Sequence, residues 1–216
     1  MSTALTTEYA RLHSAMTTPE ILDVPDLTYF MIDGSGPPGT PEFDAAMKAI
    51  YQVSYGVVGE AAAAGRHGAM PLEALWQQLG GSRAGERMMW HWTLLLLPPP
   101  LAAEDIGMLL DRTATRLRNL TPELPVDDVY AQPLSEGRCV QAMHVGPYQD
   151  EATTVTRMLA HADTNGYAPS GRRHHEIYLS DPERVAPQWL RTIIRVPLTP
   201  AVVTERHSTK NGDHHA

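Results

Sequence analysis

The chain has 216 residues, of which 43% are hydrophobic and 19% are charged. This composition excludes bulk disorder and supports a hydrophobic core in one domain or two small ones. Its 17 basic and 25 acidic residues give a formal net charge of -8, which argues against a surface that binds nucleic acid through its phosphates. The single cysteine, Cys139, cannot form a disulfide within the chain, and its apolar neighbours predict a buried strand position in a protein of a reducing compartment.

The N-terminus and the apolar runs do not indicate a membrane protein. Residues 1–20 lack a basic stretch followed by an apolar one, and no apolar run approaches the roughly 18 residues needed to span a bilayer. The longest run, residues 94–97, ends in three consecutive prolines. We therefore expect a cytoplasmic protein with no membrane partner.

Apolar residues in the first half of the chain follow a strand pattern, then a helical pattern, then two strand patterns. Thr40 and Pro41 are typical of a helix N-cap and first helical position, and apolar residues recur at helical spacing from there to Val58. In chain order, the predicted elements are a short helix (8–15), a strand (27–32), a helix (from 41 to before Gly65) and two strands (70–77 and 88–97).

The second half repeats the order strand, helix, strand, strand. A helix at residues 102–118, with acids in its first turn and arginines in its last, connects the halves. Residues 31–34 (MIDG) and 143–146 (MHVG) share a signature, since each ends a strand that runs through a glycine turn into a helix. The predicted elements of the second half are a strand (140–145), a helix (150–162) and two strands (174–179 and 193–197).

A duplication is the simplest explanation of this repeated order. Two copies of one unit bury apolar faces that neither can bury alone, usually about a pseudo-twofold axis, and the groove where they meet is the expected ligand site. We expect one α+β domain at residues 25–200. The expected divisions are an N-terminal extension (1–24), repeat one (25–100), a connecting helix (101–125), repeat two (126–200) and a polar tail (201–216).

Two motifs suggest a bound nucleotide or metal but lack what such sites require. The Gly-rich segment at residues 34–40 contains no lysine, and its prolines remove N–H donors, which favours a connecting loop over a phosphate site. His174 and His175 are neighbours on a strand and point to opposite faces, and His-x-Glu alone is a weak metal signal. We expect neither a metal nor a cofactor.

Alternation along the strand at residues 174–179 places His174, Glu176 and Tyr178 on one face. This pattern is typical either of the solvent face of a half-exposed sheet or of a site. Aromatic residues favour a site, because a carboxylate beside flat aromatic walls suits a planar or cationic ligand, although aromatics on strands are also typical of a core. The aromatic candidates are Trp76, Trp90, Trp92, Tyr51, Tyr55 and Tyr148.

Glu73 is a second candidate acid. It lies at the place in repeat one that Glu176 holds in repeat two, so the duplication predicts two acids facing each other across the groove. Strict alternation, however, puts Glu73 and Trp76 on opposite faces, so without a bulge only one of them lines the groove. The spacing does not decide which.

Several segments, in matching order, closely resemble the GyrI-like small-molecule-binding proteins, in particular the branch whose members stand alone. The resemblance covers roughly residues 20–198. The segments are 29–34 (YFMIDG), 70–76 (MPLEALW), 90–93 (WHWT), 144–148 (HVGPY), 173–182 (RHHEIYLSDP), 185–187 (VAP) and 190–193 (LRTI).

The resemblance implies an α+β fold of duplicated strand-helix-strand-strand units whose antiparallel sheets surround a central groove, as in the effector-binding domains of multidrug-sensing regulators. It implies that Glu176 matches the carboxylate that receives cationic aromatic drugs in those regulators. A repressor is not expected, because residues 1–24 are too short for a helix-turn-helix domain. The resemblance also implies catalysis, since some stand-alone members hydrolyse the cyclopropane of cyclopropanoid genotoxins of the yatakemycin and duocarmycin type and protect DNA from alkylation.

That reaction needs a general base for water and a donor for the oxygen that becomes a phenolate. Glu176 and Glu73 are the expected bases, since burial among aromatics raises a carboxyl pKa. Tyr178 or Tyr55 is the expected donor. The other residues expected to bind the ligand are Trp76, Trp90, Trp92, Tyr51, His144, Tyr148 and His174.

Two other functions stay open. A non-catalytic protein that binds or sequesters planar aromatic or cationic drugs would use the same groove. A module that acts on a protein target such as gyrase has no evident use for an aromatic pocket. We expect a small aromatic molecule as the partner, no nucleic acid, and a monomer or homodimer.

Overall fold

The computed structural model describes residues 11–61, 71–79, 89–98 and 103–201. The glycine turn expected near residues 80–85 and nearly all of the expected polar tail lie outside the described residues. Met70 and Met88, the first residues of two expected strands, also lie outside them. No helix of the described ranges is long and apolar enough to cross a membrane.

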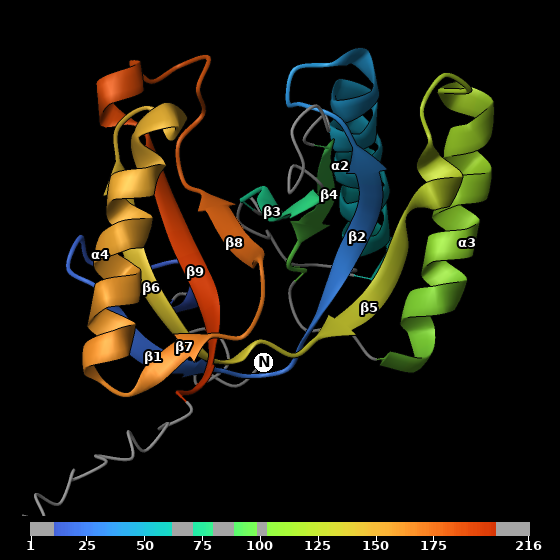
Figure 1. Ribbon diagram of the computed structural model, residues 1–216. Coiled ribbons are helices and arrows are strands. Elements are labelled where there is room, and N and C mark those ends of the chain that lie inside the picture. Colours follow the sequence, from blue (N-terminus) through green and yellow to red (C-terminus); the bar gives the residue numbers. More distant parts are fainter. Residues whose placement is uncertain (1–10, 62–70, 80–88, 99–102, 202–216) are drawn as a thin grey trace, which may run out of the picture.

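The elements follow each other as strands and helices of an α+β protein, as expected (Figure 1). The strands are β1 (Glu20–Val24), β2 (Leu27–Ser35), β3 (Glu73–Leu79), β4 (Met89–Leu96), β5 (Tyr130–Leu134), β6 (Gly137–Val145), β7 (Tyr167–Pro169), β8 (Arg173–Tyr178) and β9 (Arg191–Pro200). The helices are α2 (Pro41–Ala61), α3 (Ala103–Leu120) and α4 (Glu151–Thr164), with short 3-10 helices η1 (Val126–Asp128), η2 (Tyr148–Asp150) and η3 (Pro187–Trp189).

The strands form one antiparallel sheet in the order β1-β6-β9-β8-β3-β4-β2-β5, and β7 pairs with β9. The units β2-α2-β3-β4 and β6-α4-β8-β9 occupy the two halves in mirrored order, so β3 and β8 meet in the middle. This arrangement is the expected duplicated fold with a pseudo-twofold relation. The flanking strands β1 and β5 were not expected, because each is short and partly polar and pairs with the other repeat.

Both long helices of the repeats, α2 and α4, pack on the same face of the sheet, which we call the helix face. Ala74 of β3 pairs with Glu176 of β8, which pairs with Ile194 of β9, which pairs with Ala142 of β6, so these four side chains share a face. Ala74 is buried in the cluster that contains the apolar residues of α2, and Ile194 and Ala142 are buried against α4. Figure 1 shows α4 beside β6 and shows α2 and α3 at the other end of the sheet.

The other face of the sheet, which we call the opposite face, is covered by the segment at residues 11–16. The helix expected at residues 8–15 is helical only at residues 11 and 12 within the described part. The cause is tertiary, because backbone oxygens of this segment serve the sheet instead of a helix. The oxygen of Leu12 accepts a hydrogen bond from Arg195, and the oxygen of Met16 accepts one from the Met143 N–H.

Gly34 of β2 lies directly under the indole of Trp92, its partner on β4. A Cβ atom at this position would stand 2.0 Å from Trp92 Cη2. We expect Gly34→Ala to lower the free energy of unfolding by roughly 1–3 kcal/mol, because the indole must leave its packed position. Denaturant unfolding measures the change. Gly59→Ala on α2, where a Cβ meets no atom within 4 Å, is the matched control and should stabilise the protein.

Candidate functional site

Glu176 lies near the centre of the sheet on the helix face, with only 7% of its surface exposed. Its carboxylate accepts hydrogen bonds from His174 Nε2 at 2.8 Å and from the Tyr178 hydroxyl at 2.7 Å. The Tyr178 oxygen in turn accepts a hydrogen bond from Trp76 Nε1 at 2.8 Å. A chain of donors therefore runs from Trp76 through Tyr178 to Glu176 and fixes the carboxylate in one orientation.

The Tyr178 hydroxyl belongs to this chain as a donor to Glu176. Burial and the charge of Glu176 raise the pKa of Tyr178 well above its ordinary value, so the phenol keeps its proton. The hydroxyl hydrogen of Tyr178 therefore forms the hydrogen bond to the Glu176 carboxylate. We conclude that Tyr178 orients Glu176, and that the oxygen of a ligand would have to compete for this donor.

A second carboxyl group, that of Glu151, lies beside Glu176. Glu151 is the first residue of α4, and burial together with the negative charge of Glu176 raises its pKa to about 9. Because Glu176 has donors in His174 and Tyr178, we assign the negative charge to Glu176 and the proton to Glu151. Within the described structure the Oε1 atom of Glu151 is buried without a hydrogen-bond partner.

Sequence reasoning missed Glu151. An acid in the first turn of a helix is usually explained by the helix dipole, and this reading conceals the approach of α4 to β8. The available signal was the position of Glu151 one turn after the HVGPY segment, where α4 begins.

Aromatic rings surround this carboxyl pair. Tyr148 meets Tyr178 edge to face, with ring centroids 5.8 Å apart. Trp76 and Trp90 make a second edge-to-face contact, also with centroids 5.8 Å apart. The structure thus brings Trp76, Tyr148 and Tyr178 together around Glu176, and Trp90 extends this aromatic group onto β4.

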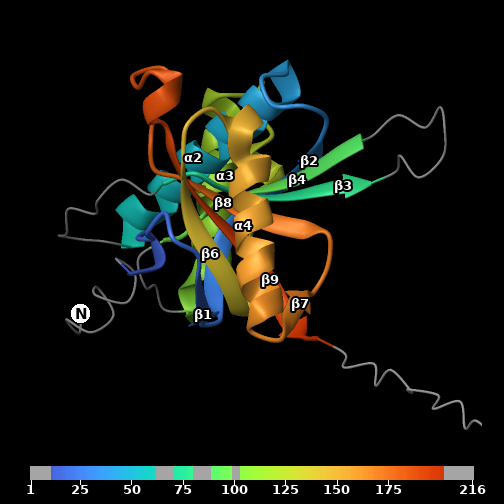
Figure 2. The same cartoon turned by 60° about the vertical axis from the view of Figure 1, so that its left-hand side comes forward.

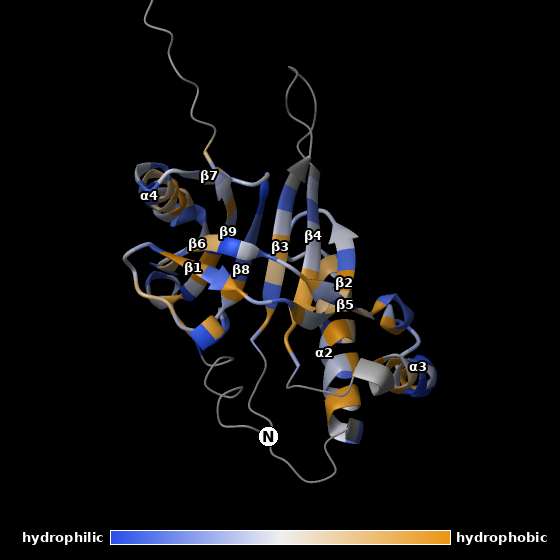
Figure 3. Cartoon of the chain, turned by 90° about the horizontal axis from the view of Figure 1, so that it is seen from below, coloured by the Kyte–Doolittle hydropathy of each residue, from blue (hydrophilic) through white to orange (hydrophobic). Residues whose placement is uncertain are grey.

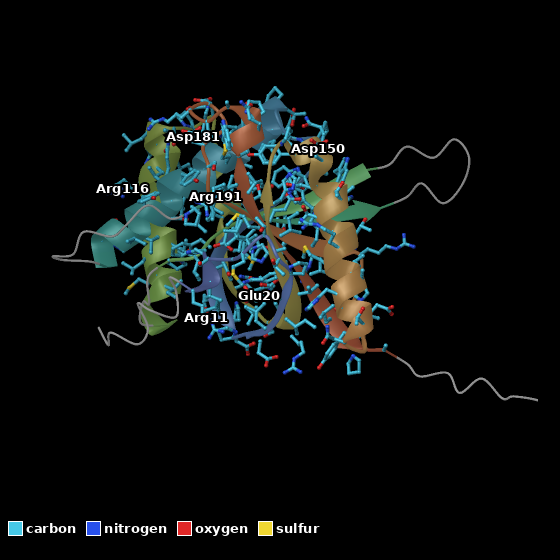
Figure 4. All side chains as sticks on the ribbon, turned by 90° about the vertical axis from the view of Figure 1, so that its left-hand side faces the viewer. Arg11, Glu20, Arg116, Asp150, Asp181 and Arg191 are labelled. Atoms are coloured by element: carbon cyan, nitrogen blue, oxygen red, sulfur yellow. The ribbon has the colours of Figure 1, made fainter. Side chains whose placement is uncertain are left out.

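The charge of Asp181 affects tyrosines of both repeats. Tyr51 stacks on Tyr55 along α2, with centroids 6.1 Å apart. Burial and then the neighbouring charges raise the pKa values of Tyr51 and Tyr148, and Asp181 is among those charges for both tyrosines. Figure 4 shows Asp181 at the same end of the molecule as Asp150, which precedes α4.

Three of the expected ligand residues are buried in the protein interior. Trp76 is 6% exposed and stacks on Phe43 of α2. Trp92 is 4% exposed and packs edge to face on Phe43 of α2, so it belongs to the core. His144 is 5% exposed, and its ring nitrogens lie 3.0 Å from Thr154 Oγ1 and 3.0 Å from the Pro147 oxygen. The structure thus gives His144 protein partners at both nitrogens.

Glu73 does not join Glu176, and this corrects the expectation of two acids across one groove. Its neighbour Ala74 is the residue that pairs with Glu176, so the Glu73 side chain lies on the opposite face. There Glu73 is fully buried, 2.8 Å from His175 Nε2 and 3.0 Å from His13 Nε2.

The register also corrects which residue of repeat one corresponds to Glu176. If Met31 corresponds to Met143, the strand pairings carry the correspondence through the sheet and put Leu72 at the place of Glu176. Glu73 then corresponds to the apolar Ile177. The carboxylate of the site is therefore present in one repeat alone.

The opposite face contains a buried ionic network that the sequence did not suggest. His175 lies between Glu73 and Glu136, and Arg195 contacts Glu136 at 3.3 Å and the Gln141 amide oxygen at 3.1 Å. Burial alone would lower the pKa of His175, but the two carboxylates raise it to about 9. Burial would raise the pKa of Glu73, but hydrogen bonds from the histidines lower it to about 2. Both ions are therefore charged at neutral pH and stabilise each other.

Among the described residues, no group of three or more His, Cys, Asp or Glu side chains could hold a metal ion.

The centre of the sheet is polar, since β8 is one of the hydrophilic stretches in the middle of the sheet (Figure 3). β3 and β4 extend side by side from this centre (Figure 2). The arrangement thus provides an anionic carboxylate, a neutral carboxyl group and aromatic surfaces in one place.

These features define an α+β fold for binding small molecules, and comparison with known proteins agrees. The family model of the GyrI-like small molecule binding domain matches residues 119–199. The chain is 30% identical to an uncharacterised conserved protein from Listeria innocua, with a TM-score of 0.77, and the match covers 90% of this chain and 98% of that one. The protein therefore belongs to the GyrI-like family.

Two further solved structures extend this comparison. A hydrolase from Listeria innocua is 29% identical, with a TM-score of 0.75 and coverage of 90% of this chain and 98% of that chain. The EcmrR C-terminal domain is 13% identical with a TM-score of 0.51, covering 85% of this chain and 98% of that chain, and it shares the fold alone. No curated protein matches the chain at a significant level.

Proposed function

We propose that the protein is a hydrolase that opens the cyclopropane ring of cyclopropanoid genotoxins of the yatakemycin and duocarmycin type. The observation that supports this proposal is the buried pair of Glu176 and Glu151 beside aromatic rings. A relative with 29% identity is described as a hydrolase, and the family binds small molecules. Acting in the cytoplasm, such an enzyme would detoxify DNA-alkylating agents or give self-resistance to a producing cell.

The reaction adds one water molecule. The Glu176 carboxylate takes a proton from water as the water oxygen attacks the methylene carbon of the ring, and one ring C–C bond breaks. Its electron pair passes into the cyclohexadienone, whose oxygen becomes a phenolate. The proton held by Glu176 returns through solvent to this oxygen, which gives a phenol and restores the carboxylate.

Each group of the site has a part in this proposal. Neutral Glu151 leaves the carboxyl pair with a single negative charge. His174 and Tyr178 hold the carboxylate so that one orientation faces the ligand. Trp90 and Tyr148, which are partly exposed, supply flat surfaces for an aromatic substrate.

A second candidate function is binding without catalysis. The match to a small-molecule-binding domain supports it directly, because an anionic carboxylate among aromatic rings also suits a planar or cationic drug. Such a protein would sequester the compound and release it unchanged.

The purified protein is incubated with yatakemycin, without added metal or nucleotide, and the products are separated by liquid chromatography and weighed by mass spectrometry. A gain of one water that the Glu176→Gln variant abolishes supports the hydrolase. Tight binding of unmodified compound identifies the sequestering protein instead. If the protein neither hydrolyses nor binds the compound, both proposals are excluded for this ligand class.

The pH profile is a separate prediction. Glu151 loses its proton as the pH rises through about 9, which places a second negative charge beside Glu176. We expect the rate of ring opening to fall over this range because the two carboxylates repel each other and the pair loses its geometry. The Glu151→Gln variant, which stays neutral, should not show this fall. A wild-type profile that stays flat through pH 10 would contradict the assigned role of Glu151.

A further inference from the structure

We propose that His144, together with Thr154, is a positioning residue of the site: its imidazole holds the segment that bears Tyr148 and Glu151 against Glu176. This inference rests on the proposed function only in treating Glu176 and Glu151 as parts of a working site. The contacts that support it are independent of any substrate.

His144 connects three parts of repeat two. It lies on β6, one ring nitrogen lies 3.0 Å from the Pro147 oxygen in the following turn, and the other lies 3.0 Å from Thr154 Oγ1 in α4. One buried ring thus fixes both ends of the turn that leads from the sheet into the helix. The chain between these two contacts includes η2 and the first residue of α4.

The direction of the hydrogen bond to Pro147 shows which ring nitrogen of His144 carries a hydrogen. The Pro147 carbonyl can only accept, so Nε2–H of His144 is the donor to it. Nδ1 then accepts from the Thr154 hydroxyl, whose oxygen accepts from Arg157 at 3.4 Å. In this tautomer the donors run in one direction, from Arg157 through Thr154 and His144 to Pro147.

The segment held in this way contains two residues of the site. Tyr148 meets the Tyr178 ring, and Glu151 lies beside Glu176. Gly146 permits the tight turn, since its φ is 139°, a conformation that residues with a Cβ rarely adopt. A purely apolar core residue at position 144 would bury the same area but leave the turn and the helix start without their common partner.

The test uses Thr154→Val, which keeps the shape of the side chain and removes the hydroxyl. The pKa of the Glu151 carboxyl is followed by carbon NMR on protein labelled at glutamate, with Glu151→Gln to assign the signal. We expect the pKa of Glu151 to fall from near 9 by about one unit or more, because the helix start moves away from Glu176. Thr154→Ser, which restores the hydroxyl, should keep the wild-type value.

Thr156→Val on the same helix is the matched control, because its exposed hydroxyl bonds only to the Ala152 oxygen among the contacts described. If Thr154→Val lowers the melting temperature but leaves the pKa of Glu151 unchanged, His144 and Thr154 are structural only and the inference is wrong. If Thr154→Val does not fold, His144→Gln, whose amide can still donate to Pro147, takes its place with the same two outcomes. The titration needs no substrate, so a failure of the hydrolase proposal leaves this test intact.

Discussion

We expect Glu176→Gln to lower the rate of the proposed cyclopropane opening by a factor of about 100 to 10,000, the range for loss of a general base. The amide has nearly the shape of the carboxylate: its oxygen can accept from Tyr178, and its N–H can donate to His174 Nε2 once that imidazole takes its other tautomer. Binding of the compound should therefore change much less than turnover. Single-turnover kinetics with a cyclopropanoid, together with tryptophan fluorescence for binding, separate the two quantities. Equal loss of binding and turnover would indicate that Glu176 acts by holding the ligand.

The matched control is Glu123→Gln, which removes an exposed carboxylate from the loop after α3 and should leave the rate unchanged. Glu151→Gln gives the most informative contrast. Because Glu151 is already neutral at pH 7, this variant should lose far less activity than Glu176→Gln at that pH. The opposite order of the two variants would assign the base to Glu151.

We expect His175→Gln to lower the free energy of unfolding by about 3–5 kcal/mol, the cost of removing one partner from a buried ion network. The substitution removes the imidazolium between Glu73 and Glu136, and leaves His13 as the remaining partner of Glu73 and Arg195 as that of Glu136. Denaturant unfolding at pH 6 measures this change. Glu73→Gln should also destabilise, since it leaves His175 and Arg195 with one carboxylate.

The double variant Glu73→Gln/His175→Gln tests whether the network acts as a unit. It removes one charge of each sign and keeps the pair of Arg195 and Glu136, so its cost should be clearly smaller than the sum of the single costs. Additive costs would show that the charges do not interact.

The same network sets a pH range for stability. The pKa of His175 is raised from 6.5 to about 9, so its contribution is complete below pH 6.5 and is lost as the pH rises through 9. The pKa of Glu73 is lowered from 4.5 to about 2, so its contribution is complete above pH 4.5 and is lost as the pH falls toward 2. The double variant should lack both losses.

The sequence predicted those parts of the site that depend on local pattern. Alternation along one strand placed Glu176 and Tyr178 on the same face, and helical spacing after Pro41 predicted α2. Glu151 was missed because its role depends on how the start of α4 meets β8, which no local spacing reports. Glu136 and Arg195 were missed for the same reason, since they are 59 residues apart and meet only in the folded sheet.

The two repeats differ at the centre of the sheet, and this difference affects the orientation in which a ligand can bind. By the strand correspondence, Leu72 and Ala74 stand where the second repeat has Glu176 and Tyr178. A truly symmetric site would accept a flat molecule equally well in two orientations related by the twofold axis. With its carboxylate on one side only, the proposed site should bind such a ligand in one of these two orientations and so bring the same end of the molecule to Glu176 each time.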